Sequence, residues 1–178
     1  MSPMRPAVSL PRLDTYPGAI PQGWLWQAKL NDERGMLSPE GMLVNRLRKP
    51  FAPHKVRAFG TALEMLVDLF PGEWVDLALL GFRGGFPAGS IVILDLPGRP
   101  GGFVDRIDII QAPYFLPDLG EELPDSPGVL RLQTDWNAKE LFLRTIGKTG
   151  LEGVIGRRPG VRYAEGDSRD MCKSKWRN

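Results

Sequence analysis

Two strongly apolar segments, 74–82 and 90–96, are joined by a glycine-rich turn at 83–89 and constrain the fold more than any other feature. Each segment is too short for an ordinary buried helix and has the length of a buried strand. Segment 24–30 alternates as a strand does, and segment 36–45 has the pattern of a hairpin. The chain is therefore expected to fold around strands.

Helices are expected to cover these strands. Apolar residues recur at helical spacing over 56–70, where Pro71-Gly72 ends the pattern. A second amphipathic helix is expected to begin with a cap near Thr134 or Asp135. The remaining expected elements are a short helix at 103–111, loops at 97–102 and 112–128, and strands at 129–134, 150–158 and 171–177. The predicted fold class is α+β, with mainly antiparallel sheets flanked by helices.

Length and composition restrict the classes of protein. The 178 residues suffice for one domain, which we expect over 24–178 after a proline-rich, irregular lead-in at 1–23. No apolar stretch approaches the roughly 20 residues of a membrane span. The single cysteine, Cys172, excludes an internal disulfide and fits a reducing, cytoplasmic setting. One cysteine and His54 cannot build a Cys/His metal site, so any metal would be a hard cation held by oxygen atoms.

Basic residues gather in two parts of the chain, although the net charge is only +2. Such clusters are compatible with a phosphate-bearing partner, and solvated surface is the alternative interpretation. The clusters are Arg46, Arg48, Lys49, His54, Lys55 and Arg57, and, toward the C-terminus, Arg157, Arg158, Arg162, Arg169, Lys173, Lys175 and Arg177.

The most informative chemistry begins at Lys29, which ends the first expected strand of the domain. A lysine attacks the α-phosphate of ATP only as the free amine. Burial or neighbouring cations favour this form because they lower the pKa of the lysine. The leaving pyrophosphate needs positive groups and a metal. Lys173 and Lys175 would share one face of a strand, and Glu152 would supply a carboxylate for the metal.

Read in order, these residues resemble the motifs of the nucleotidyltransferase (adenylation) domain of ATP-dependent DNA and RNA ligases and mRNA capping enzymes. Residues 29–34 are similar to Lys-x-Asp-Gly-x-Arg, and 151–158 to Glu-Gly-Val-Val-x-Lys-Arg. Lys173-Ser174-Lys175 resembles the last lysine motif. The other matches are Asn45-Arg46 after the hairpin, Asp76 in the place of Asp-Gly-Glu-Leu, Asp95 at the end of a hydrophobic strand, and Arg106. The similarity runs from about Trp24 onward.

The resemblance implies an ATP-grasp-like ligase adenylation fold with the nucleotide in a groove between sheets. Lys29 would carry AMP, with Lys173 and Lys175 as the other catalytic residues. Glu152 and Asp95 would hold Mg²⁺ or Mn²⁺. The implied nucleotide-binding residues are Ala28, Leu30, Arg34, Arg46, Asp76, Leu94, Glu152, Lys173 and Lys175. The implied partner is a nicked or broken nucleic acid with a 5′-phosphate, DNA being favoured over RNA, as in DNA repair.

Several positions depart from the family pattern. Ala78 stands where the third motif has glutamate, and Asn31-Asp32 replaces Asp-Gly. Leu94 replaces an aromatic residue and Met171 a tryptophan. The oligonucleotide-binding (OB-fold) domain that normally follows the last motif is expected to be absent after Lys175, so either a separate OB-fold protein supplies it or the chain is a minimal or partly degenerate enzyme. The alternative is a catalytically degenerate nucleotide- or nucleic-acid-binding module of the same fold. A Walker-type phosphate loop at 147–149 is not favoured, because its first glycine is replaced by a phenylalanine.

Overall fold

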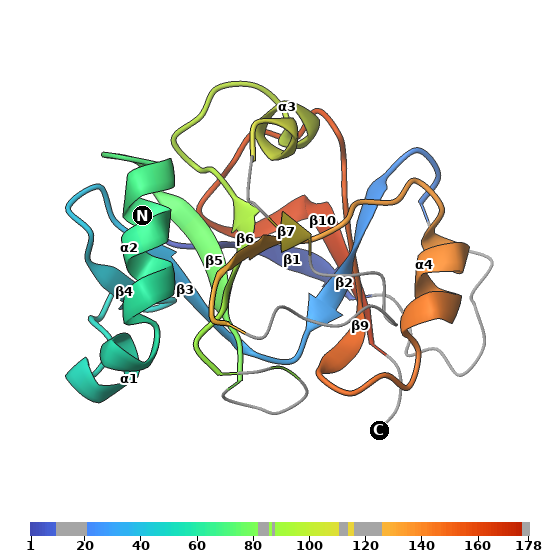
Figure 1. Cartoon of the computed structure of the whole chain (residues 1–178). Coiled ribbons are helices and arrows are strands. Elements are labelled where there is room, and N and C mark those ends of the chain that lie inside the picture. Colours follow the sequence, from blue (N-terminus) through green and yellow to red (C-terminus); the bar gives the residue numbers. More distant parts are fainter. Residues whose placement is uncertain (10–20, 82–85, 87, 111–113, 116–125, 176–178) are drawn as a thin grey trace.

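The computed structural model describes residues 1–9, 21–81, 86, 88–110, 114–115 and 126–175, with the backbone alone at 7–9 and 114–115. The strands of these residues form two sheets. Helices α1 and α2 lie on one flank of the molecule, α4 lies on the opposite flank and α3 lies above the sheets as drawn in Figure 1. The predicted α+β class is confirmed.

In the described part of the chain, the first sheet has the order β1 (Met4–Ser9), β10 (Gly166–Lys175), β9 (Leu151–Arg157) and β2 (Leu25–Leu30). Strand β9 pairs antiparallel with both of its neighbours, whereas β1 lies parallel to β10. This sheet carries the segments that contain Lys29, Glu152 and the two C-terminal lysines.

The second sheet has the order β4 (Leu43–Asn45), β3 (Glu33–Leu37), β5 (Val75–Leu79), β6 (Ile91–Asp95), β8 (Val129–Arg131) and β7 (Tyr114–Phe115) among the described residues. Pairing is antiparallel from β4 through β6 and parallel around β8. Strands β5 and β6 are the two apolar segments of the sequence, and every residue of β5 is buried. They form the centre of the fold.

Apolar burial holds helices against both sheets. The main core joins strand residues such as Leu77 and Ile93 to Leu66 of α2 (Gly60–Leu69) and Phe103 of α3 (Phe103–Asp108). Helix α4 (Ala138–Thr145) covers the first sheet through contacts among Trp26, Ala138, Leu141, Val154 and Cys172. Burying one large apolar side chain is worth about 2 kcal/mol, so these contacts fix the helices in place. None of the described helices is long and apolar enough to cross a membrane.

The helical segments differ from the sequence prediction in two places. The helix expected at 56–70 is divided into α1 (Pro53–Ala58) and α2, with Phe59 between them at a φ of −113°. Phe59 is buried in the main core, and the break turns its side chain inward. The cap of α4 is Asn137, whose side chain accepts hydrogen bonds from the backbone N–H groups of Lys139 and Glu140. Asp135 instead pairs with the backbone of Trp26.

The N-terminal region also differs from the prediction. Residues 1–23 were expected to be irregular, but Met4–Ser9 forms strand β1, because the C-terminal strand offers an edge for it to pair with. Strand β10 correspondingly begins at Gly166, five residues before the expected start at 171. Residues 83–85 and 87 of the expected turn, much of the expected loop at 112–128 and the end of the last strand at 176–177 lie outside the described residues. A domain boundary at residue 24 stays a prediction.

Candidate active site

A cleft of about 420 Å³ is lined by residues from both sheets. Gln27, Lys29 and Lys173 come from the first sheet, and Arg34 and Ala78 come from the second. Its volume falls within the range of small-molecule binding sites. Several of the residues predicted from the sequence line this cleft.

Strand β2 sets the direction of the Lys29 side chain. Alternation along the strand places Gln27 and Lys29 on one face and Trp26 on the other, where Trp26 packs near α4. Lys29 lies just before the chain leaves the first sheet for the second. Two hydrogen bonds fix that crossing, from Asn31 N to the carbonyl oxygen of Gly150 at 2.9 Å and from the backbone N–H of Gly81 to Asp32 at 3.0 Å.

A bulge in β9 brings Glu152 to Lys29. Lys29 lies opposite Gly153 and Leu30 lies opposite Leu151, which leaves Glu152 as the extra residue. A bulge of this kind re-aims a side chain. Glu152 accepts a hydrogen bond from Lys29 Nζ on one carboxylate oxygen and from Lys175 Nζ on the other, at 2.7 Å for Lys175.

Gly153 permits the close strand pairing at this point. Its φ is +156°, and a Cβ atom there would overlap the carbonyl oxygen of Ser174 on β10. Only glycine allows β9 and β10 to approach this closely beside the bulge. Because Lys175 lies opposite Gly153 in β10, this approach places Lys175 next to Glu152. The structure therefore brings the predicted residues Lys29, Glu152 and Lys175 into one cluster.

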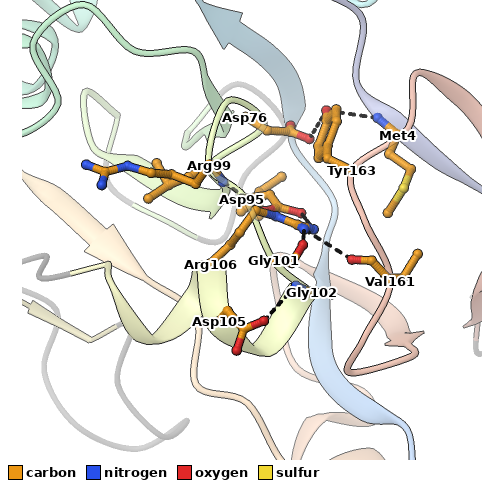
Figure 2. Close-up of polar contacts among 12 residues, drawn as sticks. Met4, Asp76, Asp95, Arg99, Gly101, Gly102, Asp105, Arg106, Val161 and Tyr163 are labelled. Atoms are coloured by element: carbon orange, nitrogen blue, oxygen red, sulfur yellow. Dashed lines mark hydrogen bonds and ion pairs between the residues drawn. The ribbon is translucent and has the colours of Figure 1, made fainter.

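A second polar group positions Arg34. Its Nε donates to Asp76 Oδ1 at 2.8 Å, and its Nη2 donates to the other carboxylate oxygen. Tyr163 donates to Asp76 at 2.8 Å and accepts from the backbone N–H of Met4 at 3.0 Å, as Figure 2 shows. Burial alone would lower the pKa of Arg34. The ion pair with Asp76 outweighs this effect, so the pKa of Arg34 is raised. Burial and the negative charge of Asp76 also raise the pKa of Tyr163.

Asp95 lies in a separate, buried ion pair. Its side chain is 1% exposed, and its two carboxylate oxygens accept from Nε and Nη2 of Arg106 at 2.7 and 3.1 Å. Arg106 also donates to the carbonyl oxygens of Gly101 and Val161, which Figure 2 shows. Arg106 therefore already uses the oxygens that a metal would need. This geometry supports a structural role for Asp95 and not the predicted metal-ligand role.

Arg157, the last residue of β9, joins the two sheets at the cleft. It donates to the carbonyl oxygen of Leu94 at 3.0 Å and lies 4.4 Å from the centre of the Phe103 ring. Burial lowers the pKa of its guanidinium, which the charge of Asp95 partly offsets. Arg157 lines the cleft and was not predicted as a site residue, although it occupies the basic position of the 151–158 motif.

Most of the predicted nucleotide-binding residues come together in the cleft. Those that line it are Ala28, Lys29, Leu30, Arg34, Arg46, Leu94 and Lys173. Glu152 and Lys175 reach Lys29 through the ion pairs described above, and Asp76 orients Arg34 from behind. Ala78, Leu94 and Leu132 form an apolar part of the wall. No group of three or more side chains suited to a metal occurs among the described residues.

Sequence reasoning missed Gln27, Arg5 and Asp167, which also line the cleft. Gln27 is 2% exposed, and its Nε2 atom has no hydrogen-bond partner in the described structure. A buried amide donor without a partner is costly unless a ligand accepts from it. Strand alternation from Lys29 gives a signal for Gln27, because residues two apart share a face. The sequence carried no such signal for Arg5 and Asp167, because they lie in segments that were not predicted to be strands.

Comparisons with known proteins bear on the fold. No family model and no curated protein sequence matches the chain. The ligase domain of LigD from M. tuberculosis superposes with a TM-score of 0.65 at 16% identity, covering 98% of this chain and 59% of that chain. A Chlorella virus DNA ligase-adenylate superposes with a TM-score of 0.62 at 16% sequence identity, covering 98% of this chain and 69% of that chain. A Lig E DNA ligase superposes with a TM-score of 0.57 at 17% sequence identity, covering 86% of this chain and 62% of that chain. This chain thus spans roughly three fifths to two thirds of these proteins, and it has the fold of the adenylation domain of ATP-dependent DNA ligases.

Proposed function

We propose that the chain is an ATP-dependent, ligase-type nucleotidyltransferase that forms a covalent lysyl-AMP intermediate on Lys29. The observation that carries this proposal is the position of Lys29 in a ligand-sized cleft, next to Glu152 and Lys175, on the fold of DNA ligases. A structure of mycobacterial DNA ligase D contains ATP, which supports a nucleotide as the ligand.

The proposed first step joins Lys29 to the α-phosphate of ATP. The Nζ lone pair attacks the α-phosphorus, the bond from that phosphorus to the bridging oxygen breaks, and pyrophosphate leaves with the electron pair. The ammonium group of Lys29 first releases one proton to solvent, and Nζ releases a second proton to solvent as the phosphoramidate forms. Since Glu152 holds Lys29 as an ion pair, this contact must break before the amine can attack.

Positive side chains would stabilise the charge that develops on the phosphates. Lys173 lines the cleft, and Lys175 reaches the same cluster from the same face of β10. Arg34, held in a fixed orientation by Asp76, would contact the nucleotide. The Gln27 amide offers a donor to an acceptor atom on the ligand. Donors fixed in advance in a water-poor site are worth more than the same groups in water.

A divalent cation fits this site through Glu152. Magnesium is usually held by one or two carboxylates together with substrate phosphates, so Glu152 beside a bound triphosphate is a suitable ligand. The metal would neutralise phosphate charge. Asp95 does not fit, because Arg106 already occupies its oxygens.

The second substrate in this proposal is a nucleic acid with a 5′-phosphate, DNA being favoured. An oxygen of that phosphate attacks the phosphorus of the lysyl-AMP, the P–N bond breaks, and Nζ leaves with the electron pair and takes up protons from solvent. A 3′-hydroxyl then attacks the activated phosphate and AMP leaves. A separate OB-fold protein that helps to hold the nucleic acid belongs to the same proposal.

One observation favours a second function, a binding module that no longer catalyses. Ala78, Leu94 and Leu132 make part of the cleft wall apolar, so that wall offers no side-chain acceptor to a ribose hydroxyl. A module of this kind would bind the nucleotide without forming a covalent bond. The arrangement of Lys29, Glu152 and Lys175 favours the catalytic function over the binding module.

Labelled ATP separates the two functions. The protein is incubated with magnesium and with ATP labelled either in the α- or in the γ-phosphate, and is then analysed by denaturing electrophoresis. The proposal predicts a protein-bound label from α-labelled ATP alone, which added pyrophosphate removes. Binding of ATP without any denaturation-resistant label would favour the binding module.

A further inference from the structure

The N-terminal strand β1 reaches the same cleft as Lys29. Pro3, Arg5 and Pro6 line the cleft together with Asp167 of β10. Arg5 lies opposite Asp167 in the strand register, and its Nε contacts Asp167 Oδ1 at 3.1 Å. Their side chains are 49% and 65% exposed, so this ion pair is in contact with water.

The polar group that positions Arg34 from behind the cleft also holds β1 in position. Met4 is buried, and its backbone N–H donates to the Tyr163 hydroxyl at 3.0 Å. The same hydroxyl donates to Asp76 (Figure 2), and Asp76 in turn accepts from Arg34. The position of Arg5, the residue after Met4, is therefore set by the group that orients a cleft arginine.

A second contact ties the residues before β1 to the loop after β4. Arg48 of that loop donates to the Ser2 hydroxyl at 2.8 Å and pairs with Glu165. Asn45 stabilises the loop by accepting from the backbone N–H of Leu47 at 2.8 Å. Arg46, in the same loop, lines the cleft, and its side chain makes no hydrogen bond or ion pair with any other described residue. Two arginines from distant segments thus line one cleft.

From this geometry we propose that Arg5 is a phosphate-binding residue of the cleft, and that Asp167 holds it while no phosphate is bound. The inference rests on the proposed function, because it assigns a further residue to the same site. An exposed ion pair contributes little to stability. A hydrogen bond from a guanidinium to a phosphate oxygen is among the stronger ones, and arginine can contact two oxygens at once. An arriving phosphate therefore displaces Asp167.

The phosphate has two possible sources with the same chemistry. One source is the outer phosphates of the nucleotide, and the other is the 5′-phosphate of the nucleic acid. Both present anionic oxygens to Arg5, and Arg46 would contribute a second cation in either case. The experiment therefore needs a binding measurement common to both sources and two kinetic measurements that separate them.

Binding of inorganic tripolyphosphate, measured by calorimetry, tests the anion site directly. Arg5→Gln is expected to weaken binding about tenfold, because it removes one charge-assisted contact. Asp167→Asn is expected to strengthen binding severalfold, because it releases Arg5, and a gain of affinity cannot result from misfolding. The matched controls are Arg99→Gln and Glu73→Gln, which alter a surface ion pair joined at 2.7 Å that does not line this cleft. Both controls are expected to bind as the wild type does.

Two kinetic arms identify the source of the phosphate. One arm measures the KM for ATP in adduct formation. The other measures single-turnover AMP transfer from preformed adduct to a nicked duplex with a 5′-phosphate. A defect of Arg5→Gln in the first arm assigns Arg5 to the nucleotide, and a defect in the second assigns it to the nucleic acid. If Arg5→Gln and Asp167→Asn both bind tripolyphosphate as their controls do, the inference is overturned, even where Lys29 forms an adduct. If binding depends on Arg5 but no adduct forms, the anion site stands and the proposed function fails.

Discussion

Glu152 accepts a hydrogen bond from the side-chain amine of Lys29, although the two residues come from strands at opposite ends of the sequence. The bulge in β9 makes this contact possible, and Lys175 binds the second oxygen of the same carboxylate. In the proposed reaction, Glu152 positions the nucleophile before ATP binds and is a ligand of the divalent cation once ATP is bound. Removing the charge of Glu152 should therefore affect the chemical step.

Glu152→Gln is expected to slow adduct formation about a hundredfold at saturating ATP and to change the KM for ATP much less. The amide keeps the shape of the side chain but loses the charge that attracts a cation. Single-turnover kinetics at several magnesium concentrations measure the effect. The control is Glu73→Gln, since Glu73 is also in an ion pair, with Arg99, and is 21% exposed compared with 19% for Glu152. Equal rates for the two variants would remove Glu152 from the mechanism.

The C-terminal lysines are expected to act on the transferred phosphate. Lys173→Ala and Lys175→Ala should each slow the transfer of AMP from ATP to Lys29 by about a hundredfold, corresponding to a loss of ~3 kcal/mol of transition-state stabilisation. Lys148→Ala is the matched control, because Lys148 does not line the cleft. Pre-steady-state adduct formation compares the three variants. Greater damage in Lys148→Ala than in the other two would place the nucleotide elsewhere.

Asp95 is expected to support the fold and not a metal. Asp95→Asn should lower the free energy of unfolding by about 3–5 kcal/mol, because it leaves the charge of Arg106 buried without a full partner. Urea denaturation measures this loss, and Glu73→Gln at the surface pair with Arg99 should cost less than about 1 kcal/mol. An Asp95→Asn protein of normal stability with an altered magnesium requirement would reverse this assignment.

Cys172 gives the fold a specific pH dependence. Burial raises the pKa of its thiol from 9.0 to about 11. The native chain thus keeps this proton where the unfolded chain loses it, so the stabilisation is complete below pH 9.0 and disappears as the pH rises through about 11. The free energy of unfolding should fall more steeply over this interval in the wild type than in Cys172→Ala. Parallel curves for the two proteins would contradict the buried thiol.

Local sequence patterns predicted the elements that carry the chemistry. The alternating segment that contains Lys29 is β2, and the expected hairpin contributes to β3 and β4. The two apolar segments are β5 and β6. Each of these depends on the length, alternation and turn residues of one short segment, which are visible in the sequence. The predicted fold of a ligase adenylation domain is confirmed by the structural matches.

Relationships between distant segments were not predictable in the same way. Strand β1 forms because β10 offers it an edge, and no periodicity within residues 4–9 reveals that partner. Asp95 has the chemistry of a metal ligand, but Arg106 occupies its oxygens. Arg5 and Asp167 meet only through the β1–β10 register. Such roles depend on which side chain the fold places nearby, and a motif cannot specify this.

The central claim is that Lys29 becomes covalently attached to AMP. Intact-mass analysis after incubation with ATP and magnesium, followed by peptide mapping, tests it most directly. We predict that the wild type and Lys148→Ala gain one AMP, mapped to Lys29 in both, and that folded Lys29→Ala gains none. An adduct that persists in Lys29→Ala, or a wild-type protein that binds ATP without gaining mass, would contradict the claim.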